Sequence, residues 1–420
     1  MGLILKLVRE KGPVSPDVPV TRVWNPGHYI RAGENIINTG NWGLNLITDG
    51  LMGFQKAYDW SELEDGLDSY KGLNATSEVA KDLQWSQDNS MRYILMLVDR
   101  TFTGGLNANP IPAYFGTPAP ESNPGQNLYV QQYSSNHNDT GIQLVRTNKT
   151  DAPNTPLNSN VRYRLKKLID QIAIRCDGHP AFEGLYLQES AYGLTDAALN
   201  ATGYSVDAYI DYYIDILTYA ANAMPYSRIF FTFNFIPNEP GLTGAHANYA
   251  IEQILAGVEG LNAVVFGGPD ALAESGAAGG TGLVGEAFPF YGTANFTLVD
   301  RRPDNTVHNV TCHGYKNRIP AAIQVSPPCY GMQWDADPLP ARYWTLEELY
   351  QWMKNTASHK GNALNASYVF WYNVNGSAGT AMDNLGAPFN GYKGGAGYLT
   401  PTGQDIISTH HLIHNYTGPK

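Results

Sequence analysis

The sequence predicts an α/β protein that folds as one (β/α)8 TIM barrel with long insertions in its βα loops. Eight segments of the chain are typical of strands, and amphipathic helical patterns separate several of them. Repeated βα units with buried strands indicate a parallel sheet, and eight such units indicate a barrel. An open doubly wound sheet is the alternative, but no Gly-x-Gly-x-x-Gly phosphate loop follows an early strand.

Four strands are expected in the first half of the chain. The clearest covers residues 92–98, a near-continuous apolar run of the kind found in strands buried on both faces. The other three lie near residues 20–30, 53–58 and 182–187. Apolar side chains recur at helical spacing over residues 161–174, which predicts a helix between the third and fourth strands.

The same alternation continues through the second half. Pro225 ends a long amphipathic helix that is expected over residues 206–224. The remaining strands are expected at residues 228–236, 263–270, 320–325 and 366–373, and the remaining helices at residues 246–258, 345–357 and 403–415.

The domain organisation that follows is simple. Residues 1–19 form an N-terminal arm, and residues 20–420 form a single barrel with insertions at about 104–156 and 276–317. Both insertions follow a strand and precede a helix, which is the side of a barrel on which active sites are built. Loops of this length are usually functional.

Composition excludes several classes of protein. The chain has 38 acidic and 27 basic side chains, a net charge of −11, which argues against a nucleic-acid partner. No apolar run approaches the roughly 18 residues that cross a bilayer, so no membrane partner is expected. The first ten residues make a poor signal peptide. We expect a soluble protein, and a secreted or a viral product both remain open.

The cysteines do not indicate a cofactor. No Cys-x-x-Cys cluster is present, and neither a metal nor another cofactor is expected. Cys176 is expected to be a small buried hydrophobe. Cys312 and Cys329 could form a disulfide, and the sequence leaves that open.

The residues just past the strands converge at one end of a barrel and carry the functional signal. They are rich in carboxylates, amides and indoles and contain almost no Lys, a combination that suits sugars. We expect Glu189 and Asp270 to be catalytic. The side chains expected to bind substrate are His28, Trp60, Asp99, Arg100, Gln188, Asn234, Gln324, Trp371, Tyr372 and Asn373.

Three short motifs resemble those of retaining (β/α)8-barrel glycoside hydrolases of the cellulase and β-galactosidase type. They are Tyr-Asp-Trp-Ser-Glu-Leu-Glu at 58–64, Gln188-Glu189, and Phe-Trp-Tyr-Asn at 370–373. The resemblance implies that Glu189 is the acid/base, with Gln188 where Asn is usual. It also implies a carbohydrate substrate and an aromatic side chain on the eighth strand that lines the innermost sugar site.

The resemblance fails at the seventh strand, where this group carries its nucleophilic Glu. The sequence there is Gln324-Val-Ser-Pro-Pro-Cys, which has no acid. Asp270 is the best substitute and Glu239 the next. A catalytically silent carbohydrate-binding or structural barrel is therefore the alternative to a hydrolase. A metal-dependent hydrolase on the same fold is a third hypothesis.

Several of these residues also have structural interpretations. Asp59 and Glu62 have the spacing of a helix-capping box. Asp99 and Arg100 fit an ion pair at the barrel mouth, and Asp270 could fix a Gly-Gly-Pro-Asp turn. Glu189 itself could pair with Arg100 or Arg22 in a buried ion pair.

Overall fold

The computed structural model describes residues 21–32, 52–101, 109–120, 122–133, 141–146, 161–187, 189–234, 236–240, 246–271, 298–302, 304, 306–310, 318–325, 333–334, 342–343 and 366–372. The expected N-terminal arm, the expected helices at 345–357 and 403–415, Cys312 and Cys329 lie outside these ranges.

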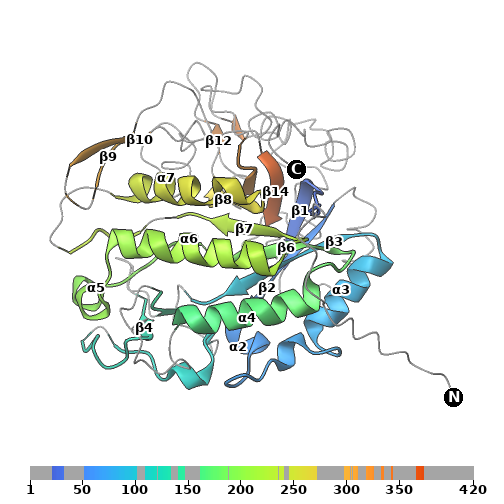
Figure 1. Cartoon of the computed structure of the whole chain (residues 1–420), viewed down its shortest axis with the longest axis horizontal. Helices are drawn as coiled ribbons and strands as arrows, with labels where there is room; N and C mark the ends of the chain where they lie inside the picture. The colour runs from blue at the N-terminus through green and yellow to red at the C-terminus, as the bar shows by residue number, and fades with distance from the viewer. Residues whose placement is uncertain are drawn as a thin grey trace.

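Eight parallel strands close into a barrel, which confirms the predicted fold class (Figure 1). All eight overlap the strands expected from the sequence. Around the barrel they are β1 (Gly27–Ala32), β2 (Gly53–Asp59), β3 (Arg92–Val98), β6 (Phe182–Leu187), β7 (Arg228–Thr232), β8 (Val264–Ala271), β11 (Ala321–Val325) and β14 (Ala366–Tyr372). The barrel closes where β1 pairs in parallel with β14.

Side chains fill the inside of this barrel. The inner cluster is Tyr29, Ile94, Met96, Tyr186, Phe230, Val265, Ala322, Tyr368 and Phe370. Several of its rings meet edge to face, as Phe230 and Tyr368 do at 5.0 Å between centroids, and Tyr186 stacks on Phe230. Because the middle of the barrel is packed, a ligand has room only at one of its ends, where the loops are.

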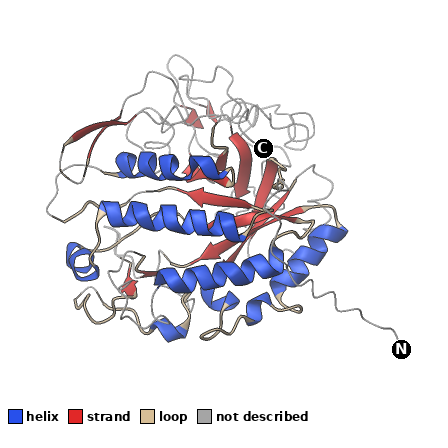
Figure 2. Ribbon diagram, in the orientation of Figure 1, coloured by secondary structure: helices blue, strands red, loops and turns tan. Residues whose placement is uncertain are grey.

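Helices cover the outside of the barrel. The long ones are α3 (Glu78–Asp88), α4 (Val161–Cys176), α6 (Val206–Ala223) and α7 (Ala247–Val258), and α4, α6 and α7 lie side by side (Figure 2). Leu165, Leu168 and Ile172 of α4 are buried at spacings of three and four residues, which gives the helix one apolar face toward the strands. The expected helices at 161–174, 206–224 and 246–258 are confirmed. Cys176 is buried, as predicted.

Short elements occupy the loops. The helical ones are α2 (Trp60–Leu63), η2 (Lys71–Leu73), η3 (Ala113–Phe115), α5 (Asp196–Thr202) and η6 (Glu259–Leu261). The antiparallel pairs are β4 (Val130–Gln132) with β5 (Ile142–Leu144), β9 (Leu298–Arg301) with β10 (Val307–Val310), and β12 (Gln333–Trp334) with β13 (Arg342–Tyr343). The sequence did not predict these hairpins, because their strands are too short to show a period.

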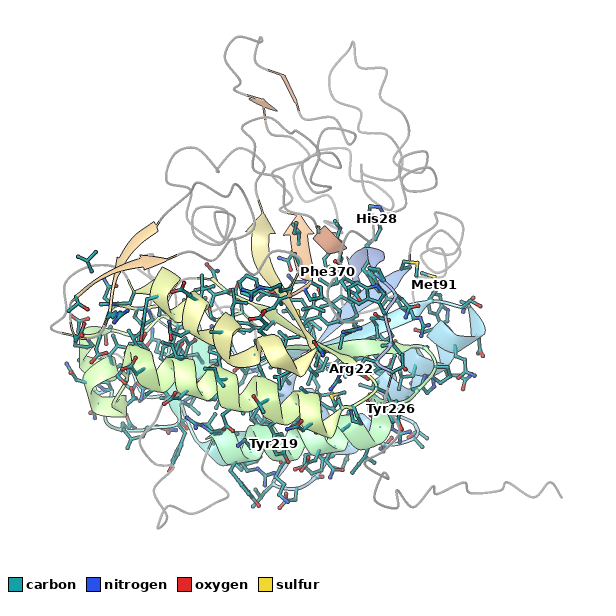
Figure 3. All side chains as sticks on the ribbon, turned by 45° about the horizontal axis from the view of Figure 1, so that its top comes forward. Arg22, His28, Met91, Tyr219, Tyr226 and Phe370 are labelled. Atoms are coloured by element: carbon teal, nitrogen blue, oxygen red, sulfur yellow. The ribbon has the colours of Figure 1, made fainter. Side chains whose placement is uncertain are left out.

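Residues 21–26 close the amino-terminal end of the barrel. Arg22 donates to the carbonyl oxygens of Ala221, Met224 and Ser227 at 2.6–2.7 Å, and it lies near Tyr226 (Figure 3). Inside the barrel, Glu183 accepts hydrogen bonds from Asn25 and from Tyr368. This end is a packed plug, so a site for a ligand belongs at the opposite, carboxyl end. No helix in the described ranges is long and apolar enough to cross a bilayer.

The turn between α4 and β6 makes stability depend on pH. Burial, and then the nearby Arg175, lower the pKa of His179, whose Nδ1 accepts from the backbone N–H of Ala181 at 3.2 Å. Between this lowered pKa and the ordinary value of about 6.5, the unfolded chain binds a proton that the folded chain does not. Stability contributed by His179 is therefore present above pH 6.5 and is lost as the pH falls.

We expect the urea concentration at the midpoint of unfolding to be lower at pH 5 than at pH 7. In His179→Asn this difference between the two pH values should be smaller. Asn keeps an acceptor for the Ala181 N–H but does not titrate. The measurement is a series of urea unfolding curves on both proteins. If the variant loses as much stability between pH 7 and pH 5 as the wild type does, other groups cause the pH dependence.

Candidate active site at the carboxyl end of the barrel

Glu189 lies at the carboxyl end of the fourth barrel strand. It follows β6 by two residues and is partly exposed. Its carboxylate Oε2 accepts a hydrogen bond from Asn234 Nδ2 at 3.0 Å. Asn234 comes two residues after β7, the next strand of the barrel. The structure therefore brings together two residues that the sequence predicted for the site.

Ser190 joins the loops that carry this pair. Its backbone N–H donates to the Thr232 carbonyl at 3.0 Å, and its Oγ accepts from the Asn234 N–H at 2.7 Å. The same hydroxyl donates to the Asn234 carbonyl at 3.1 Å. These hydrogen bonds join the segment after β6 to the segment after β7, and so fix the position of Glu189 relative to Asn234.

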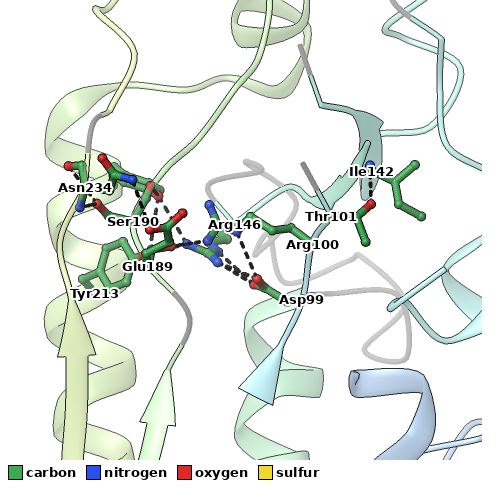
Figure 4. A network of polar contacts seen from close by, with 10 residues as sticks. Asp99, Arg100, Thr101, Ile142, Arg146, Glu189, Ser190, Tyr213 and Asn234 are labelled. Carbon is green, nitrogen blue, oxygen red and sulfur yellow. Dashed lines mark hydrogen bonds and ion pairs between the residues drawn. The ribbon is translucent and has the colours of Figure 1, made fainter. Parts of the chain in front are cut away.

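An arginine cluster contacts the backbone of Glu189. Arg100 and Arg146 both donate to the Glu189 carbonyl oxygen, Arg146 at 3.2 Å, and Asp99 binds Arg146 through both carboxylate oxygens at 2.6–2.9 Å (Figure 4). Asp99 and Arg100 also form the expected ion pair, at 3.5 Å. Arg22, the other partner considered for Glu189, lies at the opposite end of the barrel.

Asp99 and Arg100 were expected to bind substrate, and the structure places them elsewhere. They are 7% and 2% exposed. With Leu165 of α4 and with Tyr212 and other side chains of α6, Asp99 lines a cavity of about 20 Å³, in the layer between the barrel wall and the helices. The sequence could not show that Asp99 and Arg100 are buried behind the barrel wall, because residues that face the barrel mouth also directly follow a strand.

Arg31 and Gln324 meet across the inside of the barrel. They lie two residues after Tyr29 and Ala322 of the inner cluster, so strand alternation places them on the inner face. Arg31 Nη1 donates to Gln324 Oε1 at 2.8 Å, although β14 separates their strands. The sequence predicted Gln324 but missed Arg31, because β1 was expected to end at residue 30 and in fact ends at Ala32.

His28 and Trp60 are both buried, so neither is presented to a ligand. His28 is the second residue of β1, near the amino-terminal end, and Tyr29 rather than His28 belongs to the inner cluster. Trp60 is fully buried, packs edge to face on Phe115 at 5.5 Å, and donates from Nε1 to Glu64 at 2.8 Å. Its rings are therefore covered, and it supports the loop after β2 instead of stacking on a ligand.

Two other acids serve helix ends. Glu62 accepts from the Asp59 backbone N–H at 2.8 Å, which confirms the capping box at α2. Glu239 Oε2 accepts from the Val206 N–H at 3.1 Å, at the first residue of α6, where an anion is favourable.

The backbone locates Asp270 one residue before the end of β8, the sixth barrel strand. Ile323 pairs with Gly268 and Val325 with Ala271, so a β-bulge sets Pro269 and Asp270 opposite the single residue Gln324. Trp371 and Tyr372 end β14. The side chains of Asp270, Trp371 and Tyr372, and all of Gln188 and Asn373, lie outside the described part of the chain.

The seventh barrel strand carries no acid in its described residues, Ala321–Val325. This confirms that the strand count made from the sequence was right at this point. Within the described ranges, no group of three or more His, Cys, Asp or Glu side chains could hold a metal ion.

No protein-family model matches the sequence, and no curated protein matches it. Among solved structures, the catalytic domain of β-amylase from Paenibacillus polymyxa is 10% identical over 82% of this chain and 91% of its own, with a TM-score of 0.44. Endo-glycoceramidase II from Rhodococcus sp. is 9% identical over 86% and 77%, with a TM-score of 0.46. The β-mannanase of the blue mussel Mytilus edulis is 8% identical over 83% and 86%, with a TM-score of 0.39. The fold assignment itself rests on the closed ring of parallel strands, and likeness at this level assigns no activity.

Proposed function

We propose that this protein is a glycoside hydrolase that acts on an oligo- or polysaccharide, with Glu189 as general acid/base. The observation that carries the proposal is a partly exposed carboxylate after the fourth barrel strand, fixed by an amide at one oxygen. Its backbone is held by two buried arginines. Proton transfer to a glycosidic oxygen needs a carboxyl group that is both accessible and well oriented.

The amide of Asn234 gives the two carboxyl oxygens of Glu189 different roles. An N–H donor favours an oxygen that carries no proton, and Asn234 Nδ2 binds Oε2. The transferable proton then belongs on Oε1. In this mechanism Oε1 donates to the leaving oxygen, and the carboxylate so formed takes a proton back from water in the second step.

The second carboxylate in the proposal is Asp270. Its backbone position is two strands from β6, opposite Gln324 at the carboxyl end of the barrel. Gln324 and Arg31 supply an amide and a guanidinium on the inner face, two groups suited to bind sugar hydroxyls. We propose Gln188, Trp371, Tyr372 and Asn373 as further substrate contacts on sequence grounds alone.

A silent carbohydrate-binding barrel is the second candidate, and one observation favours it. The described part of the seventh strand lacks the carboxylate that retaining enzymes of this type place there. If neither Asp270 nor Glu239 acts, Glu189 has no catalytic partner among the acids proposed for that role.

The test is a panel of polysaccharides incubated with the purified wild-type protein and with Glu189→Gln, with products identified by mass spectrometry. A hydrolase gives shorter sugars with the wild type and strongly reduced amounts with the variant. Release of sugars by both proteins equally would exclude Glu189. No release by either protein, together with retention on an immobilised polysaccharide, would favour the silent barrel.

A further inference from the structure

Arg146 lies in the insertion after β3 but contacts the loop that carries Glu189. It follows β5 by two residues and is 3% exposed. Its Nε and Nη2 bind Asp99 at 2.6–2.9 Å, and its Nη1 donates to the Glu189 carbonyl at 3.2 Å. Nη1 also binds the Tyr213 hydroxyl of α6. One guanidinium therefore joins β3, the loop after β6 and α6 (Figure 4).

The charge of Arg146 is maintained by its partners. Burial acts to lower the pKa of this guanidinium, but Asp99 and then the hydroxyls of Tyr213 and Tyr209 raise it well above its usual value. Asp99 has a cation within 3 Å on both carboxylate oxygens. A buried pair of this kind is costly to break, because one charge would be left uncompensated.

The hairpin that carries Arg146 holds the same loop at a second point. Gln143 Nε2 donates to the Gly193 carbonyl at 2.5 Å. Gly193 lies against the ring of Tyr133, where a Cβ atom would come within 2.7 Å of ring carbon. Residues 189–193 are thus held by contacts with the β4–β5 hairpin and its flanking residues, and by the hydrogen bonds between Ser190 and Asn234.

We propose that Arg146 is a positioning residue for Glu189, through which the insertion after β3 acts on the reaction. The kinetic part of this inference rests on the proposed function. Arg146 touches no substrate; it fixes the backbone from which the Glu189 carboxyl extends. Lysine cannot replace Arg146. A single ammonium group cannot bind both carboxylate oxygens of Asp99 and also donate to the Glu189 carbonyl, as the planar guanidinium does.

The first experiment compares Arg146→Lys with Arg164→Lys in steady-state kinetics on a substrate found in the panel. Arg164 is a matched control: it is a buried arginine of α4 that binds Glu64 and Asp68, with no bond to residues 189–193. We expect Arg146→Lys to lower kcat about 10- to 100-fold with KM within about twofold, because small misplacement of a reacting group is costly. Arg164→Lys should lower the melting temperature but not kcat.

A chemical rescue separates positioning from general loss of structure. Arg146→Ala enlarges the cavity beside Asp99, and added guanidinium ion can occupy the space. Millimolar guanidinium should raise kcat of Arg146→Ala, while equimolar ammonium should not. If Arg146→Ala fails to fold, Arg146→Lys, which keeps a positive charge beside Asp99, carries the test with the lowered kcat expected above. Wild-type kcat in any folded Arg146 variant would overturn the proposal.

A second experiment needs no activity, so it also distinguishes failure of this inference from failure of the proposed function. Hydrogen exchange is followed by mass spectrometry on peptides that cover residues 187–195. We expect at least tenfold faster exchange in Arg146→Lys and wild-type exchange there in Arg164→Lys. Unchanged exchange in Arg146→Lys would overturn the inference even if the wild type is an active hydrolase.

Discussion

Glu189→Gln is expected to lower kcat on an unactivated glycoside by about 10²- to 10⁴-fold, the contribution of general acid catalysis. The amide is close in shape to the carboxylic acid but has no proton to give to the leaving oxygen. Its oxygen can still accept from Asn234 Nδ2, so the loop after β6 should keep its conformation. Steady-state kinetics, with thermal unfolding of both proteins, is the measurement.

The leaving group supplies the internal control for this variant. A glycoside with a very acidic leaving group needs little protonation, so its hydrolysis should suffer far less than that of a natural sugar linkage. Equal losses on both kinds of substrate would mean that Glu189 holds the sugar but does not donate the proton. Full activity on the unactivated substrate would remove Glu189 from the mechanism.

The sequence predicted the barrel well because buried parallel strands have a strong signature. Residues 92–98 form β3 with the expected bounds, and their apolar run is what a strand covered on both faces requires. The order of the strands followed from chain order alone. Strand bounds were predicted less well: β1 was expected over residues 20–30 and covers Gly27–Ala32, and β7 was expected to run to residue 236 and ends at Thr232.

The site was harder to predict, because a position after a strand does not reveal which way a side chain points. Asp99 and Glu189 both follow strands, yet Asp99 is buried behind the wall and Glu189 is partly exposed. Trp60 is of a residue type that stacks on sugars, but its ring is covered by Phe115 of η3, a short element with no periodic pattern in the sequence.

Arg146 shows a second limit of the sequence. It is distant along the chain from Asp99 and Glu189, and it lies in an insertion that has no periodic pattern. Contacts made by such a residue depend on how the hairpin packs.

The last prediction concerns the partner carboxylate. Asp270→Ala is expected to lose activity as severely as Glu189→Gln, with little change in melting temperature. The β-bulge that sets Asp270 opposite Gln324 is the structural reason to choose it, since bulges often redirect a strand end at an active site. Glu239→Gln is the matched control: Glu239 binds the first N–H of α6, so this variant should lose some stability but not kcat.

Added azide or formate then tests what Asp270 does. If Asp270 is the nucleophile, a small anion can enter the space left in Asp270→Ala and attack the sugar in its place, which restores part of the turnover and gives a glycosyl azide or formate of inverted configuration. If Asp270 is instead the base of an inverting reaction, azide takes the place of the attacking water, and the glycosyl azide has the same anomeric configuration as the wild-type product. For a nucleophile the two configurations are opposite. An Asp270→Ala protein that keeps its activity would leave Asp270 as part of the turn. Loss of kcat in Glu239→Gln instead would move the role to Glu239, since only a carboxylate that reacts with the sugar, and not one that caps a helix, needs its charge for turnover.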